Sequence, residues 1–332
     1  MSGPRKDDRG RRDEAVLDRI EDRLRDASEG FHSAGEPASA AALAAIGIDD
    51  DELGVWARWD GLELGAGDAR LLSLAEISAA SAAALAQGVV REGDRVIGER
   101  GRDLMVLPAD PWAEGATVMR VEEAGDRSPD ASSVAHLVLG WLGELAILYD
   151  DQGEFHDELF GEDGELSPTA ERRLCRRRLD LDPDAPNARL RLAELLREAG
   201  ELVAAKVELL QVLKRAPEFA WAQFALGRTL AALGQADRAL AAFRAAAECQ
   251  GEPGQRGWFL AWAARAADDG TRAELAREVL TLRPDFAAQQ AEAVATLLEH
   301  GRAEAAKEQL ELGLAVIPGH LELLRLRTQL PG

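Results

Sequence analysis

Apolar residues in the second half of the chain recur at helical spacing, in runs that end at regularly placed prolines. Pro183 and Pro217 lie 34 residues apart, and so do Pro284 and Pro318. The gap between Pro217 and Pro284 is 67 residues, one short of two such periods, and Gly251 stands where the missing proline would fall. A fixed period of this size is typical of stacked helical hairpins. We therefore predict an all-α helical-repeat solenoid in this half.

The repeating region has a recognisable start and end. Ser167 followed by Pro168 favours a helix start, because a hydroxyl group caps the helix and proline suits its first turn. A short apolar run near the C-terminus can cover the last hairpin, as terminal repeats of such arrays do. The array is predicted over residues 167–332, as a capping helix at 167–182, hairpins at 183–318 and an end helix at 319–330.

The first half of the chain has a different pattern, in which apolar spacing changes from helical to strand-like and back. Helical spacing is found at residues 13–28, 38–46, 49–59, 74–87 and 132–148. Short β-branched or apolar runs between turn-rich segments are found at residues 70–74, 95–98, 103–107 and 117–121. Such runs favour an antiparallel meander, so an α+β domain with helices on a small sheet is predicted over residues 13–150. A charged tail at residues 1–12 is expected to be disordered, and the acidic residues 151–166 are predicted to form a linker.

One unit of the array, beginning at Ala220, shows a known repeat pattern. A Leu-Gly pair, further small residues and an aromatic residue occupy fixed places along two helices: Leu226, Gly227, Leu230, Gly234, Ala239, Phe243 and Ala246. This unit resembles the tetratricopeptide repeat (TPR), in which small residues let two helices approach and glycine allows the turn between them. The resemblance implies a solenoid that binds a protein or peptide in a concave groove.

The first half also carries short motifs in a fixed order. They are Trp59-Asp60-Gly61, then residues 71–77 (LLSLAEI), 94–99 (DRVIGE), 103–107 (DLMVL) and 116–121 (ATVMRV), followed by a helix. This order resembles the SMI1/KNR4 (SUKH) superfamily over residues 13–150, although Asp60 stands where that family usually has asparagine. The resemblance implies a non-catalytic interaction domain, often an immunity protein against a secreted bacterial toxin.

Charge is distributed unevenly along the chain. The net charge is -21, and residues 1–165 carry 16 basic and 37 acidic side chains, whereas residues 166–332 carry 23 of each. An acidic surface repels nucleic acid and anionic lipid and attracts basic proteins by long-range steering. A basic toxin is therefore one expected partner, and nucleic acid and membranes are not; the alternative is that the acidity serves solubility alone. Few lysines among the 39 basic residues, with abundant alanine, indicate a GC-rich bacterial genome.

Aromatic and arginine residues line up on two of the predicted array helices. They follow i, i+3, i+7 spacing on the first helix and i, i+4, i+7 spacing on the second: Trp221, Phe224, Arg228, Trp258, Trp262 and Arg265. Trp221, Phe224 and Arg228 do not fall at core positions of the repeat, so this face is predicted to line the groove. Aromatic rings and guanidinium groups suit a peptide with a carboxylate or an acidic side chain. The alternative is that the tryptophans pack between hairpins.

One basic cluster stands at the start of the array and consists of Arg172, Arg173, Arg176, Arg177 and Arg178. Its flanks are acidic and no aromatic residues alternate with the arginines, which argues against nucleic-acid binding. We predict that the cluster pairs with the acidic first domain or linker and thereby fixes how the array is docked.

A search for catalytic or metal-binding patterns finds none that predicts a reaction. The five histidines form no metal-ligand pair, and Cys175 and Cys249 are far apart in sequence. No cofactor is predicted. The N-terminus has no secretory signal and the chain has no long apolar run, so a cytoplasmic location is expected.

These patterns favour a non-enzymatic bacterial adaptor that acts through protein–protein binding. The array would hold a peptide, and the acidic first domain would bind a second protein, such as a basic toxin that it neutralises. Two alternatives remain at this point. One is an enzyme with its active site in the N-terminal α+β domain, and the other is a regulatory scaffold.

Overall fold

The computed structural model describes residues 6–49, 51–111, 116–123, 125–150, 152–249 and 251–330, with side chains from Glu14 onward. Two compact units are present, Met1–Leu195 and Leu196–Gly332. Their division falls within helix α8, Pro186–Glu198, and each unit is described by itself. Residues 1–5 of the expected disordered tail lie outside the described part of the chain. The domain boundaries assigned from the sequence remain predictions.

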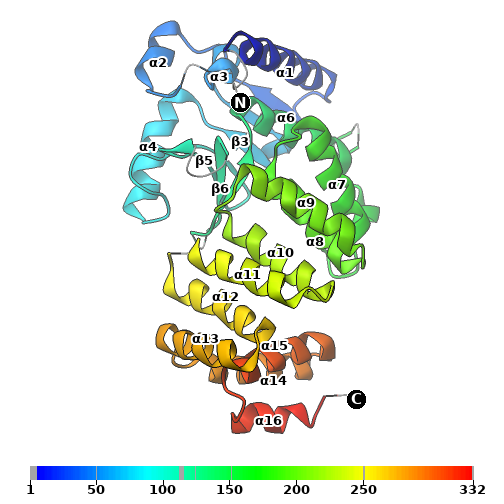
Figure 1. The fold of residues 1–332 in the computed structure, drawn as a ribbon. Helices are drawn as coiled ribbons and strands as arrows, with labels where there is room; N and C mark the ends of the chain where they lie inside the picture. The colour runs from blue at the N-terminus through cyan, green and yellow to red at the C-terminus, as the bar shows by residue number, and fades with distance from the viewer. Residues whose placement is uncertain are drawn as a thin grey trace. The chain divides into compact units, whose positions relative to one another are not determined.

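The first unit is built on an antiparallel sheet (Figure 1). Within the described residues the sheet has seven strands, which pair in sequence order. The strands are β1 His32–Ala34, β2 Leu62–Leu64, β3 Ala69–Leu71, β4 Arg95–Arg100, β5 Asp103–Leu107, β6 Val118–Val121 and β7 Arg127–Ala131. Each successive pair is antiparallel. The predicted α+β fold with an antiparallel meander is therefore confirmed.

Three strands, β1, β2 and β7, have no counterpart in the sequence prediction. β1 and β2 are three residues long, too short to display alternation. β7 reads RSPDA and contains Pro129, which a strand tolerates at a sheet edge, where one side of the backbone needs no ladder partner. β7 is at such an edge of the described sheet. Apolar alternation therefore detects most of the sheet's middle and misses its ends.

Helix α6, Val134–Leu148, forms the centre of the first unit. It begins where the Ser133 side chain accepts a hydrogen bond from the backbone N–H of His136. Buried side chains project from nearly every side of α6, as expected for a helix covered all round. Trp141 packs against β4 at Gly98, where a Cβ would lie 3.3 Å from the indole. α6 also packs against α7 and α1.

The remaining helices of the first unit surround this core. They are α1 Lys6–Asp26, α2 Ala40–Ala45, α3 Gly54–Arg58, α4 Leu74–Ala86 and α7 Pro168–Leu181, with short 3-10 turns at Gly65–Gly67 and Asp157–Leu159. As the sequence indicates, α7 starts with Pro168 behind an N-cap, the Ser167 hydroxyl, which accepts from the Ala170 N–H at 3.3 Å.

Helix α1 begins several residues before the apolar positions that predict it. The sequence places a disordered tail up to residue 12, whereas the structure has residues 6–12 in α1. The physical reason is helix propensity, because lysine and arginine are good helix formers. Four of the seven residues of this segment, KDDRGRR, are of these two types.

The second unit is a series of helical hairpins (Figure 1). Its complete helices are α9 Leu202–Arg215, α10 Ala220–Ala232, α11 Ala236–Glu248, α12 Pro253–Ala266, α13 Asp269–Leu282, α14 Phe286–Glu299, α15 Ala303–Val316 and α16 Leu321–Arg327. α10 packs against α11, α12 against α13, and α14 against α15. This arrangement confirms the predicted all-α helical-repeat array.

The turns inside the hairpins follow the sequence closely. Gly234 and Gly301 adopt φ angles of 72° and 70°, in the left-handed region that suits glycine. The hairpin of α12 and α13 lacks such a glycine. There the Asp268 carboxylate caps α13 by accepting a hydrogen bond from the Thr271 N–H at 2.9 Å. The irregular unit noted in the sequence is therefore a hairpin with a different turn.

The last hairpin is docked through its second helix. α15 packs against both α12 and α13, while α14 packs against α16. A small apolar core holds this end together: Ala287, Ala291, Val294, Ala306, Leu310, Leu323 and Leu326. The 34-residue period does not reveal this docking, because a period records the length of a hairpin and not which of its faces meets the preceding one.

Replacing Gly227 with alanine is expected to lower the free energy of unfolding of the array by roughly 1–3 kcal/mol. A Cβ there would lie 2.6 Å from the ring of Phe243, which is itself buried and cannot move aside. Gly270→Ala is the matched control, because its Cβ meets Asp268 Oδ1 at an ordinary 3.6 Å. Urea unfolding followed by circular dichroism should show a loss for Gly227→Ala only, and equal midpoints would contradict this close packing.

Candidate functional site

Six aromatic side chains form one cluster among helices α10, α11 and α12: Trp221, Phe224, Phe243, Trp258, Phe259 and Trp262. Phe224 stands at its centre. The Phe224 ring centroid lies 4.6 Å from that of Trp258 and 5.4 Å from that of Trp262. Trp221 and Trp258 lie next to each other, with centroids 5.9 Å apart. The two predicted aromatic stripes therefore meet.

Burial divides the predicted groove residues into two kinds. Phe224 is 6% exposed and Trp262 is 4% exposed, so both belong to the interior. This corrects the expectation that Phe224 lies outside the core: its ring fills the space between neighbouring helices. For Trp262 the alternative from the sequence, packing between hairpins, describes its place. Trp221 and Trp258 are half-buried and present part of their rings at the surface.

The two predicted groove arginines bind within the chain. The guanidinium carbons of Arg228 and Arg265 lie 5.1 and 5.2 Å from the ring centre of Trp262. Arg228 also donates to Glu308 at 2.8 Å, and Arg265 donates to Glu311 at 2.6 Å. Both glutamates belong to α15. In this arrangement a ligand carboxylate could reach either arginine only by displacing an acidic side chain of the last hairpin.

A cavity of about 530 Å³ opens beside the half-buried Trp221 and Trp258. Its lining comes from α10, the start of α12, the end of α13 and α14: Trp221, Glu252, Gly254, Gln255, Trp258, Arg283 and Gln290. The volume is within the range of small-molecule and peptide-side-chain pockets. The cavity therefore combines two aromatic walls with groups of both charges and with amide groups.

Gln290 is the unusual residue of this cavity. It is 6% exposed, yet within the described residues its Oε1 atom has no hydrogen-bond donor. A buried acceptor without a partner costs about 1–3 kcal/mol. Its side chain packs on Gly313 of α15, where a Cβ would lie 3.0 Å from the Gln290 Cβ. Because this oxygen is itself inaccessible to solvent, a ligand N–H could donate to it only if the Gln290 side chain turned toward the cavity.

The two charged side chains of the cavity, Glu252 and Arg283, have different hydrogen-bond partners. The Glu252 carboxylate caps α12 by accepting from the Gly254 N–H at 2.8 Å and from the Gln255 N–H. These two backbone hydrogen bonds hold the pKa of Glu252 below its usual value. Arg283 donates to the neutral Gln289 amide and lies 5.3 Å from the centre of the Phe286 ring. The Glu252 carboxylate is an acidic neighbour of Arg283, and the attraction between them also contributes to the lowered pKa of Glu252. A ligand carboxylate or carbonyl oxygen at Arg283 would share this cation with Glu252.

The basic cluster lies on α7 and its members have different roles. Arg178 is 4% exposed and donates to Asp130 at 2.8 Å. Arg173 and Arg176 are exposed, Arg177 is half-buried, and Arg172 is half-buried and has an interaction partner. Pairing with acidic residues of the first unit therefore occurs at Arg178. That the cluster fixes the docking of the array stays a prediction.

Five cavity residues were not identified from the sequence: Glu252, Gly254, Gln255, Arg283 and Gln290. Gln290 carried a signal, because Phe286, Gln290 and Val294 follow i, i+4, i+8 spacing and glutamine interrupts an apolar stripe. Arg283 carried none, since a basic residue before a helix-ending proline is common on a solvated surface.

Neither metal-binding nor membrane-spanning features are found in the part of the chain that the structure describes. No three His, Cys, Asp or Glu side chains there gather closely enough to hold a metal ion. No described helix combines the length and the apolar character that crossing a bilayer requires. Burial raises the pKa of the Cys175 thiol to about 12, so this cysteine stays protonated near neutral pH.

Comparison with known proteins gives structural similarity alone. No protein-family model and no curated protein matches the chain, so the SMI1/KNR4 resemblance stays a prediction. Among solved structures, YrrB, a TPR protein with an unusual peptide-binding site, is 21% identical and covers 48% of this chain and 82% of its own, with a TM-score of 0.32.

Two further solved structures are similar over the same share of the chain. A thermophilic TPR protein of Thermus thermophilus is 22% identical, over 48% of this chain and 89% of its own, with a TM-score of 0.31. MamA from Desulfovibrio magneticus is 16% identical, over 47% and 88%, with a TM-score of 0.34. The repeat array is defined by this chain's own 34-residue period, turn glycines and helix pairs.

Proposed function

We propose that this protein is a non-enzymatic interaction protein whose helical array binds a short peptide segment in the cavity beside Trp221 and Trp258. The observation that carries the proposal is the cavity itself. Two partly exposed tryptophans, a cation and the side chain of Gln290, whose amide oxygen is buried and unpartnered within the described residues, line one space of peptide size. Large aromatic anchors and a few well-placed polar groups are the usual means of peptide recognition.

Each wall of the cavity has a part in this binding. An apolar side chain of the peptide would pack on the two indole rings. A peptide N–H would donate to Gln290 Oε1 once that side chain turns toward the cavity, and would relieve the cost of leaving the oxygen unpaired. A peptide carboxylate or carbonyl oxygen would accept from Arg283. The preferred peptide thus has an apolar residue next to an acidic one or to a free C-terminus.

A peptide library displayed on phage and selected against the full chain tests this function. Selected peptides should lose affinity about tenfold or more with Trp221→Ala, Trp258→Ala or Arg283→Met, because truncating a central anchor costs about 2 kcal/mol. Arg277→Met is the matched control for Arg283→Met and should bind as the wild type does, because Arg277 is an exposed arginine of α13, the helix that Arg283 follows. If the selected peptides bind every variant equally, the cavity is not the site.

The acidic first half suggests a second role for the same protein. Its negative charge would speed association with a basic protein, and the SMI1/KNR4 resemblance favours immunity against a bacterial toxin, acting in the cytoplasm. A toxin gene directly beside this gene would support that role. A basic partner that binds equally well at low and high salt would contradict the electrostatic part of it.

An enzyme with its site in the first unit is the competing function class. Such a site needs a cleft in which histidine, aspartate and arginine meet, and a cavity around His32 brings these types together. However, His32 Nδ1 accepts a hydrogen bond from the Gly65 N–H at 3.1 Å, which occupies the lone pair that a general base needs. The geometry there favours binding over catalysis.

A further inference from the structure

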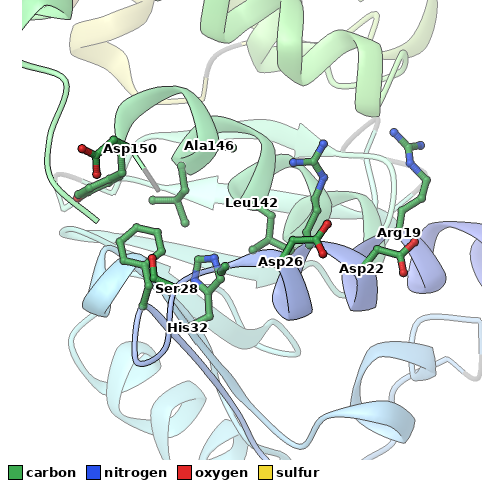
Figure 2. A pocket seen from close by; sticks show the side chains of 13 residues that line it. Arg19, Asp22, Asp26, Ser28, His32, Leu142, Ala146 and Asp150 are labelled. Atoms are coloured by element: carbon green, nitrogen blue, oxygen red, sulfur yellow. The ribbon is translucent and has the colours of Figure 1, made fainter. Parts of the chain in front are cut away.

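The first unit contains a cavity of about 470 Å³ between α1, β1 and α6 (Figure 2). Leu142 and Ala146 of α6 lie along it, and α1 contributes charged side chains. Figure 2 shows Arg19 at one end and His32 with Asp150 at the other. The cavity therefore has two chemically different ends joined by an apolar wall.

Two arginines line the first end, and the charge of a third, Arg177, acts on one of them. Arg19 and Arg23 line the cavity one helical turn apart on α1. Arg177 comes from α7 and crosses α6 at Gly143, where a Cβ would lie 3.3 Å from its Nε atom. None of the three forms an ion pair with any described residue. Burial, and then the positive charges of Arg177 and Arg19, lower the pKa of Arg23.

Three carboxylates also line this cavity, and two of them have other partners. Asp22 accepts from Arg25 at 3.0 Å. Asp150 accepts from the Gln152 and Glu154 N–H groups at 2.8 and 2.9 Å, within its own turn. Asp26 is the acidic neighbour whose charge counteracts the shift at Arg23. Asp26 is thus the carboxylate that faces the three guanidinium groups, and the balance of charge there is positive. The first half of the chain is otherwise strongly acidic.

The second end of the cavity is aromatic and offers hydrogen-bond donors. The Phe31 ring lies 4.8 Å from His32 and 5.1 Å from Tyr149, between ring centres. Because His32 Nδ1 accepts from Gly65 and burial lowers the pKa of His32, the neutral ring carries its proton on Nε2. Burial likewise raises the pKa of Tyr149, so its hydroxyl group keeps its proton. Both groups can donate to a polar atom of a ligand.

We propose that this cavity binds a small phosphate monoester with an aromatic group, its phosphate among Arg19, Arg23 and Arg177 and its ring beside Phe31 and Tyr149. Arginine forks match phosphate oxygens in pairs. A phosphate dianion neutralises three cations better than a single carboxylate does. A nucleoside monophosphate belongs to this class. The site is separate from the array and independent of peptide binding there.

Isothermal titration of the full chain with phenyl phosphate at low salt tests the proposal. We expect a dissociation constant on the order of 0.1–1 mM. Arg23→Gln and Arg177→Gln should each weaken binding at least tenfold. Arg176→Gln is the matched control, because Arg176 precedes Arg177 on the same helix and is exposed. Circular dichroism spectra that match the wild type would show that each variant is folded.

A comparison of two phosphate esters tests the aromatic end of the cavity. Phenyl phosphate should bind severalfold more tightly than methyl phosphate, and Tyr149→Ala should remove that difference while leaving methyl phosphate binding unchanged. AMP should compete with phenyl phosphate. Equal binding by the Arg23, Arg177 and Arg176 variants would overturn the site, because it would mean attraction to the surface charge alone. The site would also be overturned if the wild type bound no phenyl phosphate at a ligand concentration about tenfold above the expected dissociation constant.

Discussion

Replacing Arg178 with methionine is expected to lower the free energy of unfolding of the first unit by about 3–5 kcal/mol. Arg178 is buried between α7 and α6, over Gly140, which has no side chain to exclude it. Its guanidinium group lies 2.8 Å from Asp130 and 3.7 Å from Glu144. Methionine would keep the volume and remove the charge, so the largely buried Asp130 would lose its cation, while Glu144 would keep its ion pair with Arg100.

Arg173→Met is the matched control for this experiment, because Arg173 is exposed on the same helix and forms no ion pair with a described residue. Surface changes of this kind usually alter stability by less than about 0.5 kcal/mol. Urea unfolding followed by tryptophan fluorescence measures both variants. Equal midpoints for the two would mean that Arg178 does not hold α7 on the first unit.

Replacing Phe224 with alanine is expected to lower the free energy of unfolding of the array by about 3–5 kcal/mol. The Phe224 ring contacts five other aromatic rings, from Trp221 and Phe243 to Trp258, Phe259 and Trp262. Alanine would leave a cavity that these large side chains cannot close without moving helices.

Trp221→Ala provides the comparison for Phe224→Ala. Its ring is half-buried, so its removal should cost less than half as much stability while abolishing most peptide binding. Thermal unfolding by circular dichroism separates the two variants. A larger loss for Trp221→Ala than for Phe224→Ala would show that Trp221 is a core residue, and the peptide site would need to lie elsewhere.

The sequence predicted the array well because its signals are local. The prolines, the turn glycines Gly234 and Gly301 and the small residues at Gly227 each act within one hairpin. The sheet was found in its middle, where strands β4, β5 and β6 are apolar, and missed at β7, where Pro129 and polar residues conceal a strand. Local patterns therefore established the fold class in both units.

The surroundings of the predicted groove residues depend on contacts between distant helices, which local sequence patterns do not record. Arg228 and Arg265 looked free in sequence, and only the docking of α15 on α12 brings Glu308 and Glu311 to them. Phe224 looked peripheral because the repeat pattern describes one unit and its ring is enclosed by the next.

Among five neighbouring arginines, Arg178 could have been singled out. It follows Cys175 by three residues and precedes Leu181 by three, which places it on the buried stripe of α7. The Arg19, Arg23 and Arg177 cluster had no such signal, because it joins two helices that are distant in sequence. Long-range partners of this kind require the structure.

The central claim is that Trp221 and Trp258 hold a peptide, and nuclear magnetic resonance of their indole N–H groups tests it most directly. A library-selected peptide would be titrated into the full chain, with assignments from single Trp→Phe variants. The indole signals of Trp221 and Trp258 should shift progressively, while those of the buried Trp56 and Trp141 in the first unit should stay unchanged. A peptide that binds without shifting the signals of Trp221 and Trp258 would contradict the claim.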